Sequence, residues 1–296
     1  MRISRFLPLA ALALGTACDS NRSVAPVATT ERPAQFAKGP ATDPACRAGT
    51  LKDDQKGKLK ENSCEFTLVP GGRREDLYAL SGAGSSQMMT FTASAEFSGI
   101  FGITEADSAL FKGTVWGYEQ FVAGTPISFS IVGSSADFGF FLGGTDSTQL
   151  GKYRLTTTVG AVSHSCDRAT FLQGTVAFHT SLDGSNSCTE YVQYSPYPEA
   201  IGKPLWTHNY YAKVLAGHAY TVRVDGLDAS FGPGLTIFGG GVLAQSVGPI
   251  APDGARELTF TAPATRWVLV EISSGRFVNG TWTQQTGSYG LTFTSN

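Results

Sequence analysis

Apolar and polar residues alternate with a period of two along most of the chain after residue 45. Clear examples are residues 89–94, 127–131 and 220–225, where every second side chain is apolar. Successive side chains of a β-strand point to opposite faces of its sheet, so this pattern predicts strands that bury one face. Residues 267–272 are apolar in both alternating sets apart from Glu271, which predicts a strand buried on both faces.

Clusters of glycine, proline and aspartate separate these segments at short intervals. Many short alternating strands between turns are typical of a β-sandwich or barrel. The one candidate helix, Leu51–Lys60, contains Gly57, which weakens it. We therefore predict an all-β fold.

The order of motifs in the first half of the chain recurs in the second half. Each half has a cysteine, a Gly-Thr pair, a Ser-Cys pair, an aromatic strand and a closing Gly-x-Tyr-x-Leu-Thr strand. The offset grows from 120 residues at the first cysteine to 136 at the closing glycine, as loop insertions would produce. The repeat predicts two β-sandwich domains, residues 45–160 and 161–296, in which Tyr153 and Tyr289 are equivalent.

The N-terminus has the pattern of an export signal. Two arginines precede the apolar stretch Phe6–Leu14, which is too short for a bilayer, since spanning one takes ~20 apolar residues. The stretch runs into LGTAC, ending at Cys18, which resembles a bacterial lipobox, although the leucine stands four residues before the cysteine rather than three. We expect removal of residues 1–17 and lipid attachment at Cys18. The alternative is a signal peptide cut after Ala17 without lipidation.

Residues 18–44 are rich in Ser, Ala, Thr and Pro and lack an apolar period, which predicts a flexible linker after the lipidated cysteine. We expect an exported protein of the cell envelope, on its periplasmic or cell-surface face, held to the membrane through the N-terminal lipid.

Five cysteines are present, and four remain once Cys18 carries the lipid. Export places them where disulfides persist, and four cysteines allow three pairings. The repeat favours Cys46–Cys64 and Cys166–Cys188, one pair in each half. A zinc site is the alternative, but the spacings are long and no CxxC motif occurs.

Charge and motifs exclude several functions. Loss of the two arginines of the leader leaves 20 basic and 24 acidic residues, a net charge of −4, with no basic stripe for nucleic acid. No H-E-x-x-H, G-x-S-x-G or P-loop motif occurs, so we predict no catalytic residue, cofactor or metal. His208 is interpreted as a surface histidine at a strand edge, and Asp53 and Asp54 as part of a solvated charged loop rather than calcium ligands.

Two groups of aromatic residues are candidate ligand contacts, one on a proline-rich stretch and one flanked by glycines. The six candidates are Tyr191, Tyr194, Tyr197, Trp206, Trp116 and Tyr118. Aromatic rings on a rigid loop stack on sugars or anchor a partner protein. The alternative is that these rings fill or cover the sandwich cores.

The order of the strands carries a family resemblance. It consists of "DLYALS" and "NYYAKV", "MMTFTAS" and "AYTVRVDG", "GIFGIT" and "GLTIFGG", "FVAGTPISFSIVG" and "FTAPATRWVLVEISS", and the two closing strands. This order resembles the bacterial pre-peptidase C-terminal domain over about residues 65–158 and 190–295. The resemblance implies two tandem jelly-roll-like antiparallel β-sandwiches that act as non-catalytic accessory modules, some of which bind polymers or proteins.

The sequence therefore predicts a non-catalytic lipoprotein of the cell envelope that binds a polysaccharide or a surface protein. A secreted hydrolase with a site that sequence motifs do not reveal, and an architectural spacer without a ligand, are the alternatives.

Overall fold

The computed structural model describes residues 47–66, 73–81, 84–105, 115–133, 137–192, 198–228, 231–246, 254–278 and 281–295. In these ranges every regular element is a β-strand apart from one 3-10 turn, Pro198–Ala200. The prediction of an all-β fold is confirmed. No helix within the same ranges has the length and apolar character needed to cross a membrane.

The first half of the chain builds two facing sheets. Its strands are β1 (Arg47–Thr50), β2 (Asp54–Leu59), β3 (Cys64–Phe66), β4 (Arg73–Ser81), β5 (Gln87–Ala95), β6 (Gly99–Glu105), β7 (Val115–Phe121), β8 (Ile127–Gly133), β9 (Asp137–Gly144) and β10 (Gly151–Ala161). One sheet has the order β1-β4-β9-β6-β7, with β3 also paired to β4, and the other contains the run β2-β10-β5-β8.

The second half repeats this arrangement. Its strands are β11 (Ala169–Gln173), β12 (Val176–Leu182), β13 (Cys188–Tyr191), β14 (Pro204–Val214), β15 (Ala219–Gly226), β16 (Gly234–Phe238), β17 (Val242–Ser246), β18 (Ala255–Thr261), β19 (Arg266–Ser274), β20 (Arg276–Val278), β21 (Thr281–Thr283) and β22 (Gly287–Ser295). The orders β11-β14-β19-β16-β17 (with β13 on β14) and β12-β22-β15-β18 match those of the first half strand for strand. Only the hairpin β20–β21 is added, and β22 takes the place of β10.

The strand order corrects two details of the sequence alignment. By its pairing, β8 corresponds to β18 and β9 to β19, so the segment ending at Gly133 does not match the strand Arg266–Ser274. Tyr78 and Tyr210 each bond the tyrosine of the closing strand, so Tyr210 rather than Tyr211 is the equivalent of Tyr78. Two adjacent tyrosines in β14 and loops of unequal length explain the one-residue slip.

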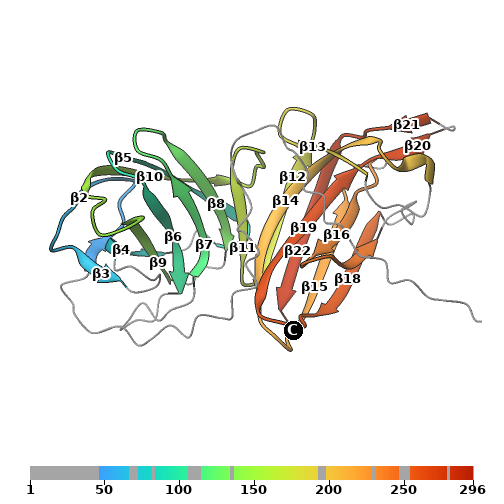
Figure 1. The fold of residues 1–296 in the computed structure, drawn as a ribbon. Helices are drawn as coiled ribbons and strands as arrows, with labels where there is room; N and C mark the ends of the chain where they lie inside the picture. Colours follow the sequence, from blue (N-terminus) through green and yellow to red (C-terminus); the bar gives the residue numbers. More distant parts are fainter. Residues whose placement is uncertain are drawn as a thin grey trace, which may run out of the picture.

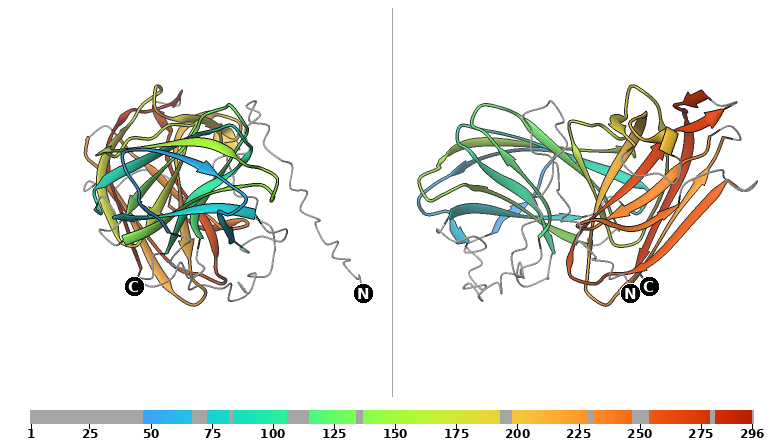
Figure 2. Two further views of the ribbon diagram at one scale, coloured as in Figure 1. Left: turned by 90° about the vertical axis from the view of Figure 1, so that its left-hand side faces the viewer. Right: turned by 45° about the vertical axis from the view of Figure 1, so that its right-hand side comes forward.

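The two sandwiches share a sheet. Strand β8 of the first pairs in parallel with β11 of the second, and this pairing merges two four- and six-strand units into one ten-stranded sheet. Strand β11 therefore stands between the two halves (Figure 1), which lie side by side and overlap when viewed along their common axis (Figure 2). Strands β1 and β11 also run parallel to β4 and β14, so the sheets are mixed rather than purely antiparallel.

The shared sheet presents opposite faces to the two cores. In β11, Phe171 lies in the first core and its neighbour Leu172 in the second. In β8, Ile131 and Val132 divide in the same way. Because successive side chains of a strand alternate between faces, one sheet closes both sandwiches from opposite sides. All five residues of β11 are buried as a result.

The candidate helix at Leu51–Lys60 is wrong, since Asp54–Leu59 forms strand β2. Gly57 lies opposite Tyr153 in the neighbouring strand. A Cβ on Gly57 would stand 2.2 Å from the Tyr153 ring. This glycine is therefore needed for the close approach of the ring. Tyr153 and Leu155, like Tyr289 and Leu291, are buried along one face of their closing strands, as predicted.

Candidate functional site

Equivalent tyrosine pairs lie inside both sandwiches. In the first, Tyr78 and Tyr153 place their hydroxyl groups 2.5 Å apart, and Tyr153 donates to Asp76. In the second, the hydroxyl groups of Tyr210 and Tyr289 are 2.7 Å apart. Burial raises the pKa of Tyr153 and Tyr289 well above the usual range, so both remain neutral.

His208 occupies in the second sandwich the place that Asp76 has in the first. Its Nδ1 is 2.7 Å from the Tyr289 hydroxyl, and its Nε2 is 3.0 Å from Asn186 Oδ1. The amide of Asn186 donates to the Ser181 carbonyl, so Oδ1 faces the ring and His208 carries its proton on Nε2. Tyr289 then donates to Nδ1. The interpretation of His208 as a surface residue is wrong, because its side chain is fully buried.

A second histidine covers the first. His164 stacks on His208 with ring centroids 4.3 Å apart. It bonds the Asn186 carbonyl through Nδ1 and accepts the Asn209 amide proton at Nε2. Burial lowers the pKa of His164, and burial together with the neighbouring His164 ring lowers the pKa of His208 to about 2. Both rings are therefore neutral at pH 7.

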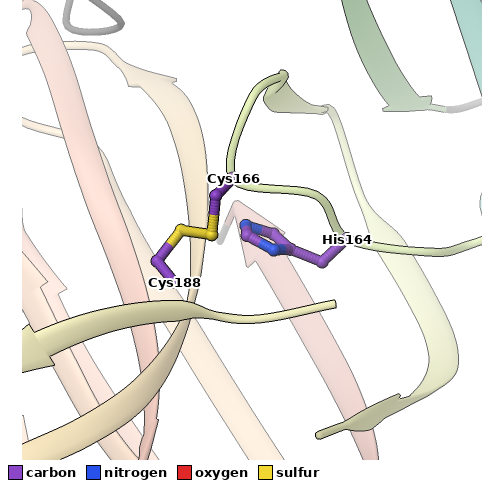
Figure 3. Close-up of side chains that lie close together, drawn as sticks. All are labelled: His164, Cys166 and Cys188. Atoms are coloured by element: carbon purple, nitrogen blue, oxygen red, sulfur yellow. A yellow bond between two sulfur atoms is a disulfide. The ribbon is translucent and has the colours of Figure 1, made fainter. Parts of the chain in front are cut away.

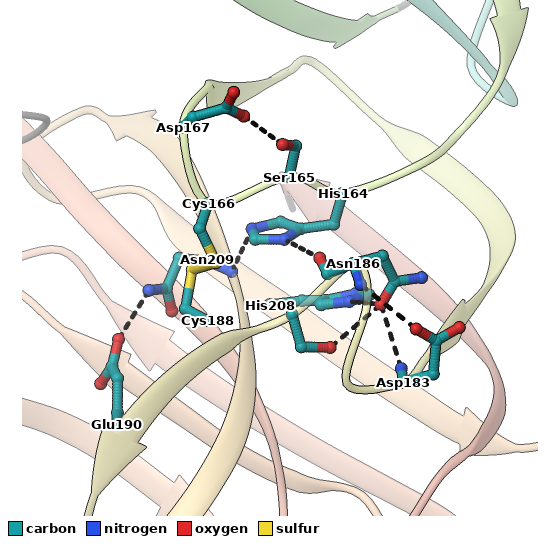
Figure 4. The surroundings of a disulfide bond; sticks show 11 residues. His164, Ser165, Cys166, Asp167, Asp183, Asn186, Cys188, Glu190, His208 and Asn209 are labelled. Carbon is teal, nitrogen blue, oxygen red and sulfur yellow. Dashed lines mark hydrogen bonds between the residues drawn. A yellow bond between two sulfur atoms is a disulfide. The ribbon is translucent and has the colours of Figure 1, made fainter.

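The predicted disulfide Cys166–Cys188 is confirmed, with Cα atoms 5.2 Å apart. It ties the segment before β11 to β13 and lies beside His164 (Figures 3 and 4). Within the described ranges, His164, Cys166 and Cys188 are the one group of His, Cys and acidic residues close enough together to hold a metal ion. The paired sulfurs are not thiolates, and both nitrogens of His164 are already hydrogen-bonded. This cluster is built as a structural support.

A row of aromatic rings leads out of the first core onto the outer face of the second sandwich. Phe171 packs against Phe129 inside the first core, with centroids 5.7 Å apart. On its other side it meets Trp267 at 5.3 Å and Tyr211 at 5.8 Å. Trp267 and Tyr211 belong to β19 and β14, and both are partly exposed. The row therefore ends at the surface where the two sandwiches meet.

Polar groups border the exposed end of this row. Tyr211 pairs with Leu269, and Asn209 with Glu271, across β14 and β19. Asn209 Nδ2 donates to Glu190 Oε1 at 2.8 Å (Figure 4). Glu119 of β7, on the edge of the first sandwich, interacts electrostatically with Tyr211. We call these partly exposed residues the junction surface: Glu119, Glu190, Asn209, Tyr211, Trp267, Leu269 and Glu271.

The carboxyl groups of the junction surface hold protons unusually well. Burial raises the pKa of Glu119 to about 7. Burial, with the charge and hydrogen bond of Glu190, raises the pKa of Glu271 to about 8. Burial and the charges of Glu119 and Glu190 raise the pKa of Tyr211 to about 12. Near neutral pH the surface therefore offers hydrogen-bond donors and acceptors together, beside two aromatic rings.

The same geometry disfavours glycoside hydrolysis at the Glu190–Glu271 pair. Catalytic carboxyl pairs of glycosidases stand ~5–5.5 Å apart in retaining enzymes and ~6.5–9.5 Å apart in inverting ones. Glu190 and Glu271 share a hydrogen bond and are therefore closer than either class needs. The pair is suited to holding a proton between two oxygens.

Sequence reasoning did not find the junction surface. Strand β19 was expected to be buried on both faces, but only Val268, Val270 and Ile272 are buried, whereas Trp267, Leu269 and Glu271 are partly exposed. The available signal was Glu271, a carboxylate within an otherwise apolar run. Glu190 and Glu119 come from distant segments, which only the fold brings near.

The six predicted aromatic contacts have different outcomes. Tyr191 is 63% exposed, and Tyr118 is partly exposed on β7. Trp206 is partly buried against the second core, and a Cβ on Gly184 would stand 2.9 Å from its ring. Trp206 is therefore a packing residue and not a free contact. Tyr194, Tyr197 and the side chain of Trp116 lie outside the described residues.

Other predicted sites are also only partly visible. Cys18 and Cys46 lie outside the described residues, as does the side chain of Cys64, so lipid attachment and the first disulfide stay predictions. Asp53 and Asp54 are exposed, as expected, and Asp54 forms an ion pair with Arg154 at 2.7 Å.

Comparison with known proteins gives no family. No family model and no curated protein matches the chain. Among solved structures, the PBSX exported protein XepA aligns with 81% of this chain and 86% of its own length at 13% identity and a TM-score of 0.24. An anti-sigma factor domain-containing protein from Clostridium clariflavum aligns at 14% identity over 82% and 86%, with a TM-score of 0.22. Tripeptidyl peptidase 2 aligns at 10% identity over 84% of this chain and 24% of its own, with a TM-score of 0.20. Scores this low support no inference about fold or function.

Proposed function

We propose that the protein is a non-catalytic lipoprotein of the cell envelope that binds a neutral polysaccharide through the junction surface. The observation that carries this proposal is the row of aromatic rings that runs from Phe171 to Tyr211 and Trp267 and ends among carboxyl groups. Sugar rings stack on aromatic faces, and their hydroxyl groups need both donors and acceptors. Partly protonated carboxyl groups and Asn209 supply both.

Charge favours a neutral polymer over an anionic one. The mature chain has a net charge of −4, and three glutamates border the binding face. An anionic polymer brought to this face would meet like charges, which costs free energy on burial. A sugar polymer without acidic groups avoids that repulsion.

Binding is tested with the purified full-length protein on an array of neutral and acidic glycans. Trp267→Ala and Glu271→Gln should each weaken binding to neutral glycans by about tenfold, as expected for truncating a central contact. Tyr191→Ala is the matched control, since Tyr191 is a more exposed aromatic residue at another place. Because Trp267 also packs on Phe171, thermal melting must show that the variant is folded. Equal loss in Tyr191→Ala, or unchanged binding in both junction variants, would contradict the proposal.

Attachment to the membrane is tested separately. Wild-type protein should incorporate a palmitate analogue and partition into detergent, whereas Cys18→Ser should do neither. A wild-type protein that takes up no label would favour the alternative of a signal peptide cut after Ala17.

A hydrolase is the second candidate, and the hydrogen-bonded Glu190–Glu271 pair is the observation that favours it. Two carboxyl groups that share a proton activate water in aspartic proteases. Hydrolysis of a peptide or glycan substrate near pH 5 that is abolished in Glu271→Gln would establish this function in place of binding alone.

A further inference from the structure

The joint between the two sandwiches has open counterparts at both ends of the molecule. Within the chain, β8 of one repeat pairs in parallel with β11 of the next. Strand β18 holds the place of β8 in the second sandwich, and β1 holds the place of β11 in the first. In the part of the chain that the structure describes, both are the last strands of their sheets. We propose that two copies of the chain associate head to tail by pairing β18 of one with β1 of the other.

The core-facing side of β18 is consistent with such a joint. Phe129 and Phe91 are opposite each other in the first sandwich, and Leu258 and Val222 in the second. Phe129 is fully buried next to β11, whereas Leu258, its equivalent at the sheet end, is partly exposed. A β-strand added there would complete the burial of Leu258, as β11 does for Phe129.

The charged residues of β18 leave its edge free to pair. Arg256 is turned inward, where its Nε donates to the Pro233 carbonyl. Glu257 reaches Arg223 of the neighbouring strand β15, with 3.9 Å between charged atoms. Charged groups that point along an edge are a usual defence against strand pairing, and neither of these residues takes that position.

The register of the internal joint defines the contact between copies. Ile131 pairs with Phe171 across β8 and β11. Phe260 is the equivalent of Ile131, and Thr50, which is exposed, is the equivalent of Phe171. The joint between copies therefore places Thr50 where the internal joint buries an aromatic ring. This substitution makes the association of copies weaker than the internal joint and concentration-dependent.

The contact is heterologous, because different surfaces of the two copies meet. Such contacts do not close on themselves in a dimer and extend into rings or open chains. A copy blocked at β1 keeps a working β18, and a copy blocked at β18 keeps a working β1. Two differently blocked copies should consequently form a dimer that does not grow.

This property gives a decisive experiment by analytical ultracentrifugation of the full-length protein in detergent micelles. Thr50→Lys blocks β1 and Leu258→Lys blocks β18, and each should stay monomeric alone. Their equimolar mixture should form a dimer. Thr50→Phe should tighten the self-association of an otherwise wild-type chain at least about tenfold, since it restores the buried ring. Thr283→Phe, an exposed threonine on the hairpin β20–β21, is the control and should leave association unchanged.

The proposal fails if wild type and Thr50→Phe both remain monomeric at every concentration. It also fails if the mixture of blocked variants shows no dimer while thermal melting shows both to be folded. Association that is equal in wild type, Thr50→Lys and Leu258→Lys would indicate a different interface between copies.

Discussion

The two sandwiches have one strand order but differ in the outer face of the corresponding sheets. In the first, Leu77 pairs with Phe141, and both are almost fully buried. In the second, the equivalent pair is Asn209 and Glu271, and both are partly exposed. The same topology therefore supports an apolar, covered face in one repeat and a polar, accessible face in the other. Because fold is maintained by the inner residues, the outer ones are free to provide function.

The interiors differ in a single polar position. Asp76 receives the hydrogen bond of the central tyrosine pair in the first sandwich, and the neutral His208 does so in the second. Asp76 is partly exposed, whereas His208 is fully buried. A buried charge without a partner is costly, so the deeper position uses a neutral ring with both nitrogens bonded.

The largest expected effect separates adjacent residues of β11. Phe171→Ala should lower stability by about 3–5 kcal/mol, and Leu172→Ala by about 2–5 kcal/mol, because each leaves a core cavity. Amide hydrogen exchange should show that Phe171→Ala weakens protection in β5, β8 and β10, although residue 171 belongs to the second half of the sequence. Leu172→Ala should act mainly on β14, β15 and β22. Identical exchange patterns in the two variants would refute the assignment of opposite faces to opposite cores.

Removal of one hydroxyl group compares the two interiors. Tyr289→Phe leaves the buried Nδ1 of His208 without its donor and should destabilise the protein by about 1–3 kcal/mol. Tyr153→Phe should cost less, since Asp76 is partly exposed and water replaces the lost bond. Urea denaturation of both variants at pH 7 provides the measurement. A larger loss for Tyr153→Phe would show that burial does not explain the difference.

Acid should act on the second sandwich first. The pKa of His208 is near 2 in the folded protein, below its ordinary value of 6.5, so the unfolded chain binds the extra proton. Stability from this group is complete above pH 6.5 and declines as the pH falls toward 2, by up to about 1.4 kcal/mol per pH unit. Hydrogen exchange at pH 7 and pH 5, corrected for the intrinsic rate, should show greater loss of protection in β14 and β22 than in β4 and β10. Equal loss in both halves would contradict the assignment.

Alkali should act in the opposite direction through Glu271. Its pKa of about 8 in the folded protein lies above the ordinary value of 4.5, so the folded state holds the proton more strongly. The stabilising contribution is complete below pH 4.5 and is lost as the pH rises through 8. The stability of wild type relative to Glu271→Gln should fall by about 1 kcal/mol between pH 5 and pH 8.5, a value kept small because the group is partly exposed. A pH-independent difference would mean that Glu271 ionises normally.

The sequence allowed the strands, the repeat and the second disulfide to be predicted because each rests on a local pattern. Alternation along 220–225 and the Gly-x-Tyr-x-Leu-Thr strands depends only on neighbours in the chain. The shared sheet was not predictable, since nothing in β8 distinguishes an edge from a strand that pairs with another sandwich. His208 was misplaced for a related reason: its partners Asn186 and Tyr289 are brought to it only by folding.

The central claim is that the polar, accessible face of the second sandwich is the binding site. Hydroxyl-radical footprinting of the protein, with and without a neutral polysaccharide selected on the glycan array, tests it most directly. Oxidation of Tyr211 and Trp267 should fall when the polymer is bound, while that of the exposed Tyr191 and of Tyr118 stays unchanged. Protection of Tyr191 or Tyr118 with unaltered oxidation of Tyr211 and Trp267 would contradict the claim.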